Sequence, residues 1–194
     1  MPGLARFRDR FGPPTAARPA DPAVCERYAA RLPAALIEEW RESGWAAYAD
    51  GRLWLVNPDD YTEAMDEWLP DLCADPDTRP LVFARSAFGD LLVAHDADST
   101  GQLNVHYGRF VDLVAEPDDF LDLLLDLPYL ADALDGDLAA QAVLRAGPLA
   151  ADEMFAFQPA LALGGARHLD HVVKVKMEPH LAILVQLFDA ITFE

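Results

Sequence analysis

The chain has 194 residues, of which 52% are hydrophobic and 25% are charged, a composition typical of a folded globular protein. This length is enough for one large hydrophobic core or two small ones, so disorder over most of the chain is excluded. A net charge of −18 disfavours binding to nucleic acid or to anionic membranes, and it favours a basic partner.

The acidic residues are concentrated in two blocks. Residues 59–77 contain eight acids and no base, and nine acids lie between Arg109 and Arg145 with no Lys or Arg among them. Residues 1–31 contain six Arg and three acids, so the net charge divides into +3 there and −21 over the rest. Charge blocks are commonly solvated faces, but two blocks without compensating bases also fit an interaction surface.

The sequence has none of the features that would place the chain in a membrane or an oxidising compartment. No stretch approaches the ~20 apolar residues of a membrane span, and the first residues lack the apolar run of a signal peptide. Cys25 and Cys73 lie in no CxxC or near-His spacing, so we expect two buried free thiols. We therefore expect a cytoplasmic protein.

The first half of the chain predicts an arm, a helix and a hairpin. Prolines among small residues over 1–22 predict a flexible N-terminal arm. A helix is expected from Pro33 to Gly44, because Pro suits a first turn and Gly a C-terminal stop. Apolar runs flank Asp50-Gly51, and this dipeptide favours a tight hairpin turn with positive φ at both central positions.

An acidic helix is predicted over 58–69, capped by Asn57 or Asp59 and ended by Pro70. Its apolar residues fall on one face and are expected to point inward. They are Tyr61, Met65, Trp68 and Leu69. The acids of this helix are therefore expected on its outer face.

The remaining elements predict an α+β fold. Four short strands form an antiparallel meander, followed by a second acidic helix, a third helix, an alternating strand and a C-terminal helix. Their expected ranges are 81–87, 90–96, 102–107, 110–115, 120–134, 137–147, 172–176 and 178–191. The architecture is a mainly antiparallel sheet with helices packed on one face and a C-terminal helix.

Few residues suggest catalysis or metal binding. His95, Asp96 and Asp98, or His168 with His171, could be assembled into a metal site, but their spacing does not support one. His95 and His106 lie at predicted strand ends, where hydrogen-bonded or surface residues are more common. No nucleophile elbow, HExxH, Walker loop or GxGxxG is present, so we expect no cofactor.

Three smaller patterns carry predictions. Gly164-Gly165 could bind an anion through exposed amides, but a turn requirement explains it better. Lys174 and Lys176 alternate with valines and should share one face of a strand, either solvated or held by Asp152 or Glu153. The aromatic residues are expected in the core. Phe88 is the expected exception, because a tight turn would push it outward.

Two long segments resemble a known pair of domains. GWAAYADGRLWLVNPDDYTEAMDEWL, followed by VFARSAFGDLLVA, is similar to the GAD-like domain. DEMFAFQPALALGG, followed by KVKMEPHLAILVQL, is similar to the C-terminal domain of type VI secretion immunity proteins. The resemblance implies a GAD-like region over 23–115 and an immunity-type region over 116–194 on the same core. It also implies structural roles for motif residues in the second region, which are Gly164, Gly165, Lys174, Lys176 and His180.

The resemblance implies that the protein binds and neutralises a cognate secreted toxin, a DNase, without catalysing a reaction. Our hypothesis is stoichiometric inhibition, in which acids on two helices meet basic groups of the toxin. The candidate residues are Asp59, Asp60, Glu63, Asp66, Glu67, Asp118, Asp119, Asp122 and Asp126. Contact with the toxin's active site and contact with an exosite both remain open. Two other functions also remain open: a metal-dependent enzyme using His95, Asp96 and Asp98, and an acidic adaptor module.

Overall fold

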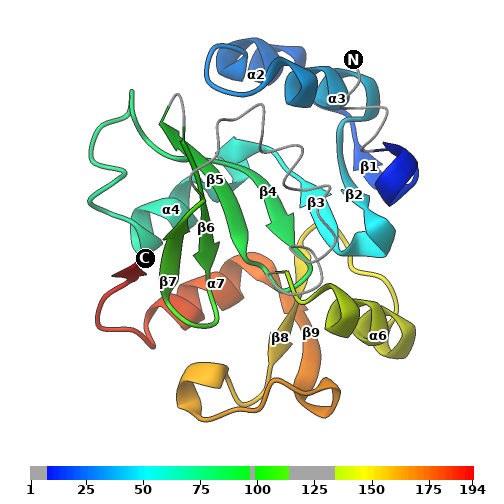
Figure 1. Cartoon of the computed structure of the whole chain (residues 1–194), viewed down its shortest axis with the longest axis vertical. Helices are drawn as coiled ribbons and strands as arrows, with labels where there is room; N and C mark the ends of the chain where they lie inside the picture. Colours follow the sequence, from blue (N-terminus) through cyan, green and yellow to red (C-terminus); the bar gives the residue numbers. More distant parts are fainter. Residues whose placement is uncertain (1–7, 97–98, 114–133) are drawn as a thin grey trace.

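The computed structural model describes residues 8–96, 99–113 and 134–194, and within them a large sheet is the centre of the fold (Figure 1). Eight strands follow the order β1-β2-β3-β4-β5-β6-β7-β10. They are β1 (Thr15–Arg18), β2 (Trp45–Tyr48), β3 (Leu53–Leu55), β4 (Leu81–Ser86), β5 (Leu91–Asp96), β6 (Ser99–Asn104), β7 (Arg109–Asp112) and β10 (Thr192–Phe193). A separate two-stranded sheet pairs β8 (Glu153–Phe157) with β9 (Val172–Lys176).

The large sheet is a meander, as predicted. Each strand from β1 to β7 pairs antiparallel with the next, and only β10 joins in parallel, along β7. The predicted hairpin at Asp50-Gly51 is confirmed, with Ala47 opposite Trp54 across β2 and β3. Its loop is a short 3-10 turn, η1 (Ala49–Gly51), in which all three residues have positive φ.

The helices are α2 (Pro22–Tyr28), α3 (Ala34–Ser43), α4 (Thr62–Trp68), α6 (Gly136–Ala146) and α7 (Met177–Val185). Four of them lie close to predicted positions, although α7 ends at Val185 rather than at 191, and α2 was not predicted. Three further 3-10 turns are η2 (Pro58–Tyr61), η4 (Leu161–Leu163) and η5 (Leu169–His171). The predicted second acidic helix over 120–134 falls almost entirely on residues outside the described ones. No helix in the described ranges is long and apolar enough to cross a membrane.

The prediction of a flexible arm over 1–22 is wrong for residues 15–18. They form β1, which pairs with β2, and Arg8 makes an ion pair of 2.8 Å with the buried carboxylate of Glu39 on α3. The tight approach of this segment also explains Gly44, because a Cβ there would lie 2.2 Å from the Arg18 carbonyl oxygen. The prolines flank β1 without interrupting it, and residues 8–11 before them are helical, so this segment is ordered.

Helices cover both faces of the large sheet, which corrects the prediction that they cover one. Successive side chains of a strand point to opposite faces, and β3 shows this clearly. Leu53 and Leu55 pack in a cluster with α2 and α3, whereas Trp54 packs in a second cluster with α4 and α7. The central strands β3 and β4 are buried at every position, as expected for a sheet that is covered on both faces.

The β8–β9 sheet belongs to the second of these clusters. Met154 and Phe155 on β8 are fully buried and pack there with Phe88 from the β4–β5 turn. Phe88 itself corrects a prediction, because it is buried rather than pushed outward. Its ring stacks on Phe157 with centroids 5.0 Å apart and an interplanar angle of 2°. The turn directs this side chain inward, against a second sheet that local sequence did not reveal.

Candidate functional site

The acidic segment η2–α4 is held by its apolar face. The Asn57 side chain accepts a hydrogen bond from the Asp59 amide at 3.2 Å, which caps the start of η2 as predicted. Tyr61, Met65 and Trp68 are all buried in the core. The inward stripe is therefore confirmed, and among the acids Asp60, Glu63, Asp66 and Glu67 are exposed, whereas Asp59 is partly buried.

Three of the five candidate acids on this segment already have cationic partners within the chain. Asp59 pairs with Arg27 at 3.1 Å and accepts a hydrogen bond from the Tyr28 hydroxyl at 2.5 Å. Burial, together with the Asp59 carboxylate, raises the pKa of Tyr28 to about 12. Two further ion pairs join Arg18 to Asp60 and Arg79 to Asp66. Arg18 and Arg27 of the basic N-terminal part, together with Arg79, thus neutralise part of the acidic block.

The other two acids of α4 carry their charge outward. Glu63 and Glu67 are one helical turn apart and exposed, and within the described ranges neither makes an ion pair. The second predicted set, Asp118, Asp119, Asp122 and Asp126, lies outside the described residues. The structure therefore describes one of the two predicted acidic surfaces.

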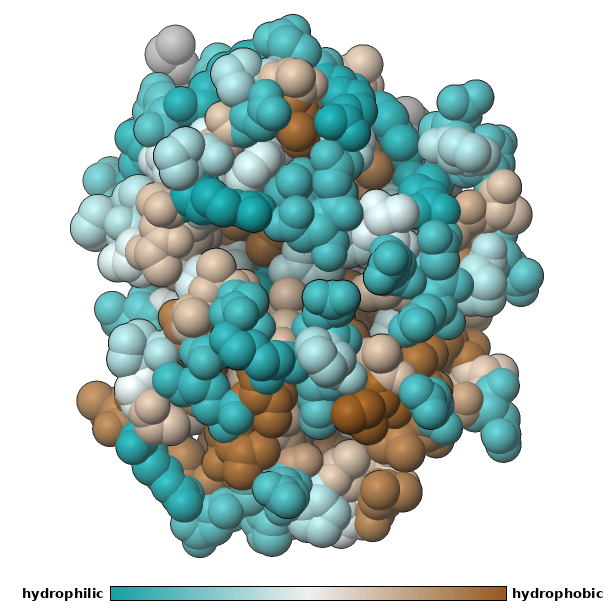
Figure 2. Space-filling model, turned by 180° about the vertical axis from the view of Figure 1, so that it is seen from behind, coloured by the Kyte–Doolittle hydropathy of each residue, from teal (hydrophilic) through white to brown (hydrophobic). Residues whose placement is uncertain are grey.

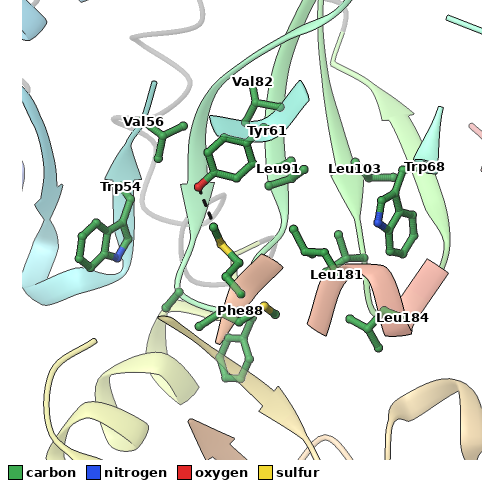
Figure 3. Packing of buried hydrophobic residues seen from close by; sticks show 14 of the residues in the cluster. Trp54, Val56, Tyr61, Trp68, Val82, Phe88, Leu91, Leu103, Leu181 and Leu184 are labelled. Carbon is green, nitrogen blue, oxygen red and sulfur yellow. Dashed lines mark hydrogen bonds between the residues drawn. The ribbon is translucent and has the colours of Figure 1, made fainter. Parts of the chain in front are cut away.

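Helices α4 and α7 lie side by side and run in the same direction, as the contacts at their two ends show. Just before α4 begins, the Tyr61 hydroxyl donates to the Met177 sulfur at 3.8 Å, at the first residue of α7 (Figure 3). At the end of α4, the Trp68 ring centroid lies 6.0 Å from that of Phe188, just beyond α7. Between these two contacts, Leu181 and Leu184 of α7 pack in the same hydrophobic cluster (Figure 3). Each end of the helix pair opens into a cavity.

The first cavity, of about 430 Å³, lies at the start of both helices. Its walls include Trp54, Tyr61 and Met177, and its rim carries the Arg18–Asp60 ion pair. A second pair on the rim joins Lys176 to Asp152 at 2.6 Å. Because Asp152 accepts from Lys176, the pKa of this exposed carboxyl is lowered. The charges of this cavity are mostly balanced within the chain.

The lysine clamp predicted on β9 is confirmed. Lys176 reaches Asp152 at 2.6 Å and Glu153 at 3.9 Å, and Lys174 approaches Glu153 at 4.0 Å. Lys174 also donates to the Pro148 carbonyl at 2.7 Å. These contacts join β9 to the start of β8.

The second cavity is a groove of about 320 Å³ at the ends of α4 and α7, which we call the acid-rimmed groove. Its apolar wall includes Trp68, Phe188 and Phe193. Its only charged lining residues, among those the structure describes, are carboxylates. They are Glu67, Asp71 and Asp189. Sequence reasoning missed this groove, because its walls come from segments more than 100 residues apart.

A buried cation lies behind the first cavity. The Arg85 guanidinium is fully buried, lies 4.4 Å from the Trp54 ring centroid, and donates to the carbonyls of Ser86 and Ala151 at 3.2 and 3.1 Å. Burial lowers the pKa of Arg85. Because it forms no ion pair with a described carboxylate, its charge is held by carbonyl dipoles, the Tyr61 hydroxyl and an aromatic face. It links β4 to the segment before β8.

A second buried polar group closes the β4–β5 turn. The Asp90 carboxyl accepts hydrogen bonds from the Ser86 hydroxyl at 3.3 Å and the Val105 amide at 3.2 Å. Burial raises the pKa of Asp90 to about 7. Nearby, His106 contacts the Phe88 carbonyl at 2.9 Å, and burial lowers its pKa to about 4. With Asp90 and His106 only 2% and 4% exposed, this cluster organises a turn and offers a substrate no access.

The histidines do not converge on a metal site in the part of the chain that the structure describes. His168 accepts from the Asp170 amide, and His171 contacts the Gln158 carbonyl, so each has a separate local partner. Burial lowers the pKa of the half-buried His180. The side chains of the alternative set, His95, Asp96 and Asp98, lie outside the described residues.

The Gly164-Gly165 pair meets a backbone requirement. Gly164 has a φ of 85° and ends η4, and a Cβ on Gly165 would lie 1.9 Å from the Pro159 carbonyl oxygen. Only glycine fits both conditions without a shift of the loop. This geometry supports the turn interpretation over anion binding.

Exposed apolar side chains gather in one half of the molecule. Figure 2 shows the face opposite to that of Figure 1, with apolar residues concentrated in its lower half and hydrophilic residues above. The lower half contains α6, α7, β8 and β9. Large exposed apolar residues in the described ranges are Tyr107, Leu144, Leu163, Ile183 and Phe193. Apolar surface of this kind is a common feature of binding sites.

Comparison with known proteins identifies two consecutive domains. Residues 3–107 match the family model of the GAD-like domain, and residues 115–188 match that of the T6SS immunity protein Tdi1, C-terminal. A search of curated proteins gave no significant match. The fold is similar to the crystal structure of Atu4351 from Agrobacterium tumefaciens, with a TM-score of 0.73 and 19% identity. That similarity covers 93% of this chain and 87% of the other, and at this identity it shows the fold alone.

The first match covers more than half of the chain, and both matches agree in identity and order with the resemblance drawn from the sequence. The second domain supports an immunity-protein role. The chain belongs to the GAD-like family, in the form that carries the C-terminal domain of the type VI secretion immunity protein Tdi1.

Proposed function

We propose that the protein binds a cognate type VI secretion effector, a DNase, and neutralises it by stoichiometric inhibition through its acidic surface. It makes and breaks no covalent bond, and it acts in the cytoplasm, where a DNase would meet its substrate. The observation that carries this proposal is the outer face of α4, where the exposed carboxylates of Glu63 and Glu67 have no ion-pair partner among the described residues.

The physical argument rests on charge complementarity. A nuclease must offer a positively charged groove to the phosphates of its substrate. Carboxylates fixed on a rigid helix can compete for that groove and speed the encounter at low salt. Because α4 is held against the core by Tyr61, Met65 and Trp68, its charges are presented without a large loss of conformational entropy.

The candidate acids are expected to contribute unequally to binding of the effector. Asp59, Asp60 and Asp66 are each paired with an arginine of the same chain, so their attraction for a partner is reduced. Glu63 and Glu67 are expected to contribute more per residue. Asp118, Asp119, Asp122 and Asp126 stay a prediction from sequence, as does the choice between the active site and an exosite.

Co-expression with a candidate effector, such as a secreted nuclease encoded next to this protein's own gene, tests this proposal. Wild-type protein is expected to preserve cell survival and intact genomic DNA. In a separate binding experiment, it is expected to form a one-to-one complex with a catalytically inactive effector. The charge-reversed variant Glu63→Lys/Glu67→Lys should bind more weakly, and its affinity should depend less steeply on salt.

A control is Glu26→Lys/Glu38→Lys on α2 and α3, because these helices pack against the opposite face of the sheet. It makes the same change in net charge. Glu26 also loses its ion pair with Arg41 in this variant, so thermal unfolding checks that the fold is kept. If wild-type protein gives no protection and no complex, the immunity proposal is wrong. If both double variants lose affinity equally, only the local role of α4 is wrong.

The alternative functions predict different outcomes. A metal-dependent enzyme using His95, Asp96 and Asp98 would carry stoichiometric metal after purification. An adaptor would bind the effector or another protein without protecting cells. Metal analysis and the survival assay therefore separate the three.

A further inference from the structure

We propose that the acid-rimmed groove is the anchor site for a basic segment of the effector, which inserts one large apolar side chain between flanking cations. This inference rests on the proposed function and deepens it, because it names the surface and the chemistry of the partner. The groove lies at the ends of α4 and α7, next to Glu67 on the acidic face of α4.

The floor of the groove is apolar and partly open. Trp68 and Phe188 lie with ring centroids 6.0 Å apart, and Leu72 and Val185 extend the same wall. Phe193 is 57% exposed, and its ring lies 5.6 Å from that of Phe110. An exposed aromatic ring beside a cavity is a typical anchor point, because a partner side chain can displace water from both surfaces.

The outer wall of the groove is held in place by the backbone. Thr192 donates to the Gly108 carbonyl and Glu194 to the Phe110 carbonyl, each at 2.9 Å. In return, the Asp112 amide donates to the Glu194 carbonyl at 3.0 Å. These bonds attach β10 to the sheet, so the groove exists before any partner binds and little ordering is needed.

The negative charge at the rim of the groove favours a basic occupant. The charged groups lining the groove in the described residues are Glu67, Asp71 and Asp189, and Glu67 has no ion-pair partner there. A partner that presents Lys or Arg around its apolar side chain would satisfy these carboxylates at the rim while the centre becomes dry.

The same charge argues against two occupants from this protein, residues 114–133 and a second copy of the chain. Residues 114–133 contain six acids and no base, so they would bring like charge to the rim. A second copy of the chain, with a net charge of −18, would also be repelled. A basic partner is the occupant that the rim favours.

The test measures binding of the inactivated nuclease domain of an effector that wild-type protein neutralises in the co-expression assay. Phe193→Ser should weaken binding at least about tenfold, with little change in salt dependence, because it removes an apolar contact. Glu67→Gln/Asp71→Asn/Asp189→Asn should weaken binding mainly at low salt and flatten the salt dependence. Leu163→Ser is the matched control, because this apolar residue is 67% exposed but lies on η4, outside the groove.

Thermal unfolding of each variant checks that the fold is kept, and hydrogen exchange of wild-type protein gives a second measurement. Bound effector should protect residues 67–72 and 185–193. If wild-type protein binds and protects cells but both groove variants bind within twofold of it, the groove proposal is wrong and the immunity proposal stands. If wild-type protein neither binds nor protects, both are wrong. Self-association of wild-type protein that is lost in Phe193→Ser would assign the groove to a second copy and overturn the proposal.

Discussion

The Tyr61 hydroxyl donates to the Met177 sulfur at 3.8 Å, across 116 residues of sequence. This contact joins the acidic segment of the GAD-like domain to the first residue of α7 in the Tdi1-type domain. A second contact between the two domains, that of Trp68 with Phe188, lies at the other end of the helix pair. The position of the acidic face is therefore set by a core that both domains share.

The first prediction concerns this shared core. Trp68→Ala should lower the free energy of unfolding by about 3–5 kcal/mol, because it leaves a cavity beneath α4 and beside Phe188. Urea unfolding followed by circular dichroism measures the change. Leu144→Ala on α6 is the control, since this side chain is 88% exposed and should change stability by less than about 0.5 kcal/mol. A loss of equal size in both variants would contradict the packing described here.

The second prediction concerns pH. The pKa of Asp90 is raised to about 7, so its protonated form favours folding, and that stability is lost as pH rises from about 4 to 7. The pKa of His106 is lowered to about 4, so its neutral form favours folding, and that stability is lost as pH falls from about 6.5 to 4. The two effects have opposite signs in this window.

Single substitutions should separate them. Between pH 4.5 and 6.5, Asp90→Asn should gain about 3 kcal/mol of stability relative to wild type, and His106→Gln should lose a similar amount relative to wild type. Unfolding by urea at both pH values gives these differences, and titration of all other groups cancels in them. If neither difference varies with pH, burial does not shift these groups as described.

The sequence predicted the local elements of this fold well. Gly44, Asp50-Gly51 and Asn57 act within a few residues, so the end of α3, the β2–β3 hairpin and the start of η2 follow from nearby side chains. The alternation around Lys174 and Lys176 likewise predicted the clamp to Asp152 and Glu153. Each of these features is decided by short-range geometry.

The features that the sequence did not predict depend on distant contacts. Phe88 is buried only because β8 brings Phe157 against it, and the acid-rimmed groove exists only because Phe188 and Phe193 return to α4. The partners of the acids were also missed, since Arg27 and Asp59 are 32 residues apart and only the fold brings them together. Charge counting showed that a block was acidic without showing which acids were neutralised.

The third prediction concerns the buried guanidinium of Arg85. Arg85→Met should be more stable than Arg85→Ala by about 2 kcal/mol, because Met keeps much of the packing on Trp54 and removes a buried charge that has no described carboxylate partner. Urea unfolding compares the two variants. Equal stability of both would show that packing of this side chain on Trp54 contributes little and would contradict the prediction.

The last prediction concerns the internal partners of the acidic face. Arg79→Gln should free the carboxylate of Asp66, with which Arg79 forms an ion pair beside Glu63 and Glu67. One added charge at a distance of about 8 Å in water is worth about 0.5 kcal/mol, so association with a basic effector should become roughly twofold faster at low salt. Stopped-flow mixing with inactive effector measures this rate. Arg41→Gln is the control, because it makes the same change in net charge by freeing Glu26 on the α2–α3 side of the sheet. An equal acceleration in both variants would assign the effect to net charge and would contradict a local role of α4 in docking.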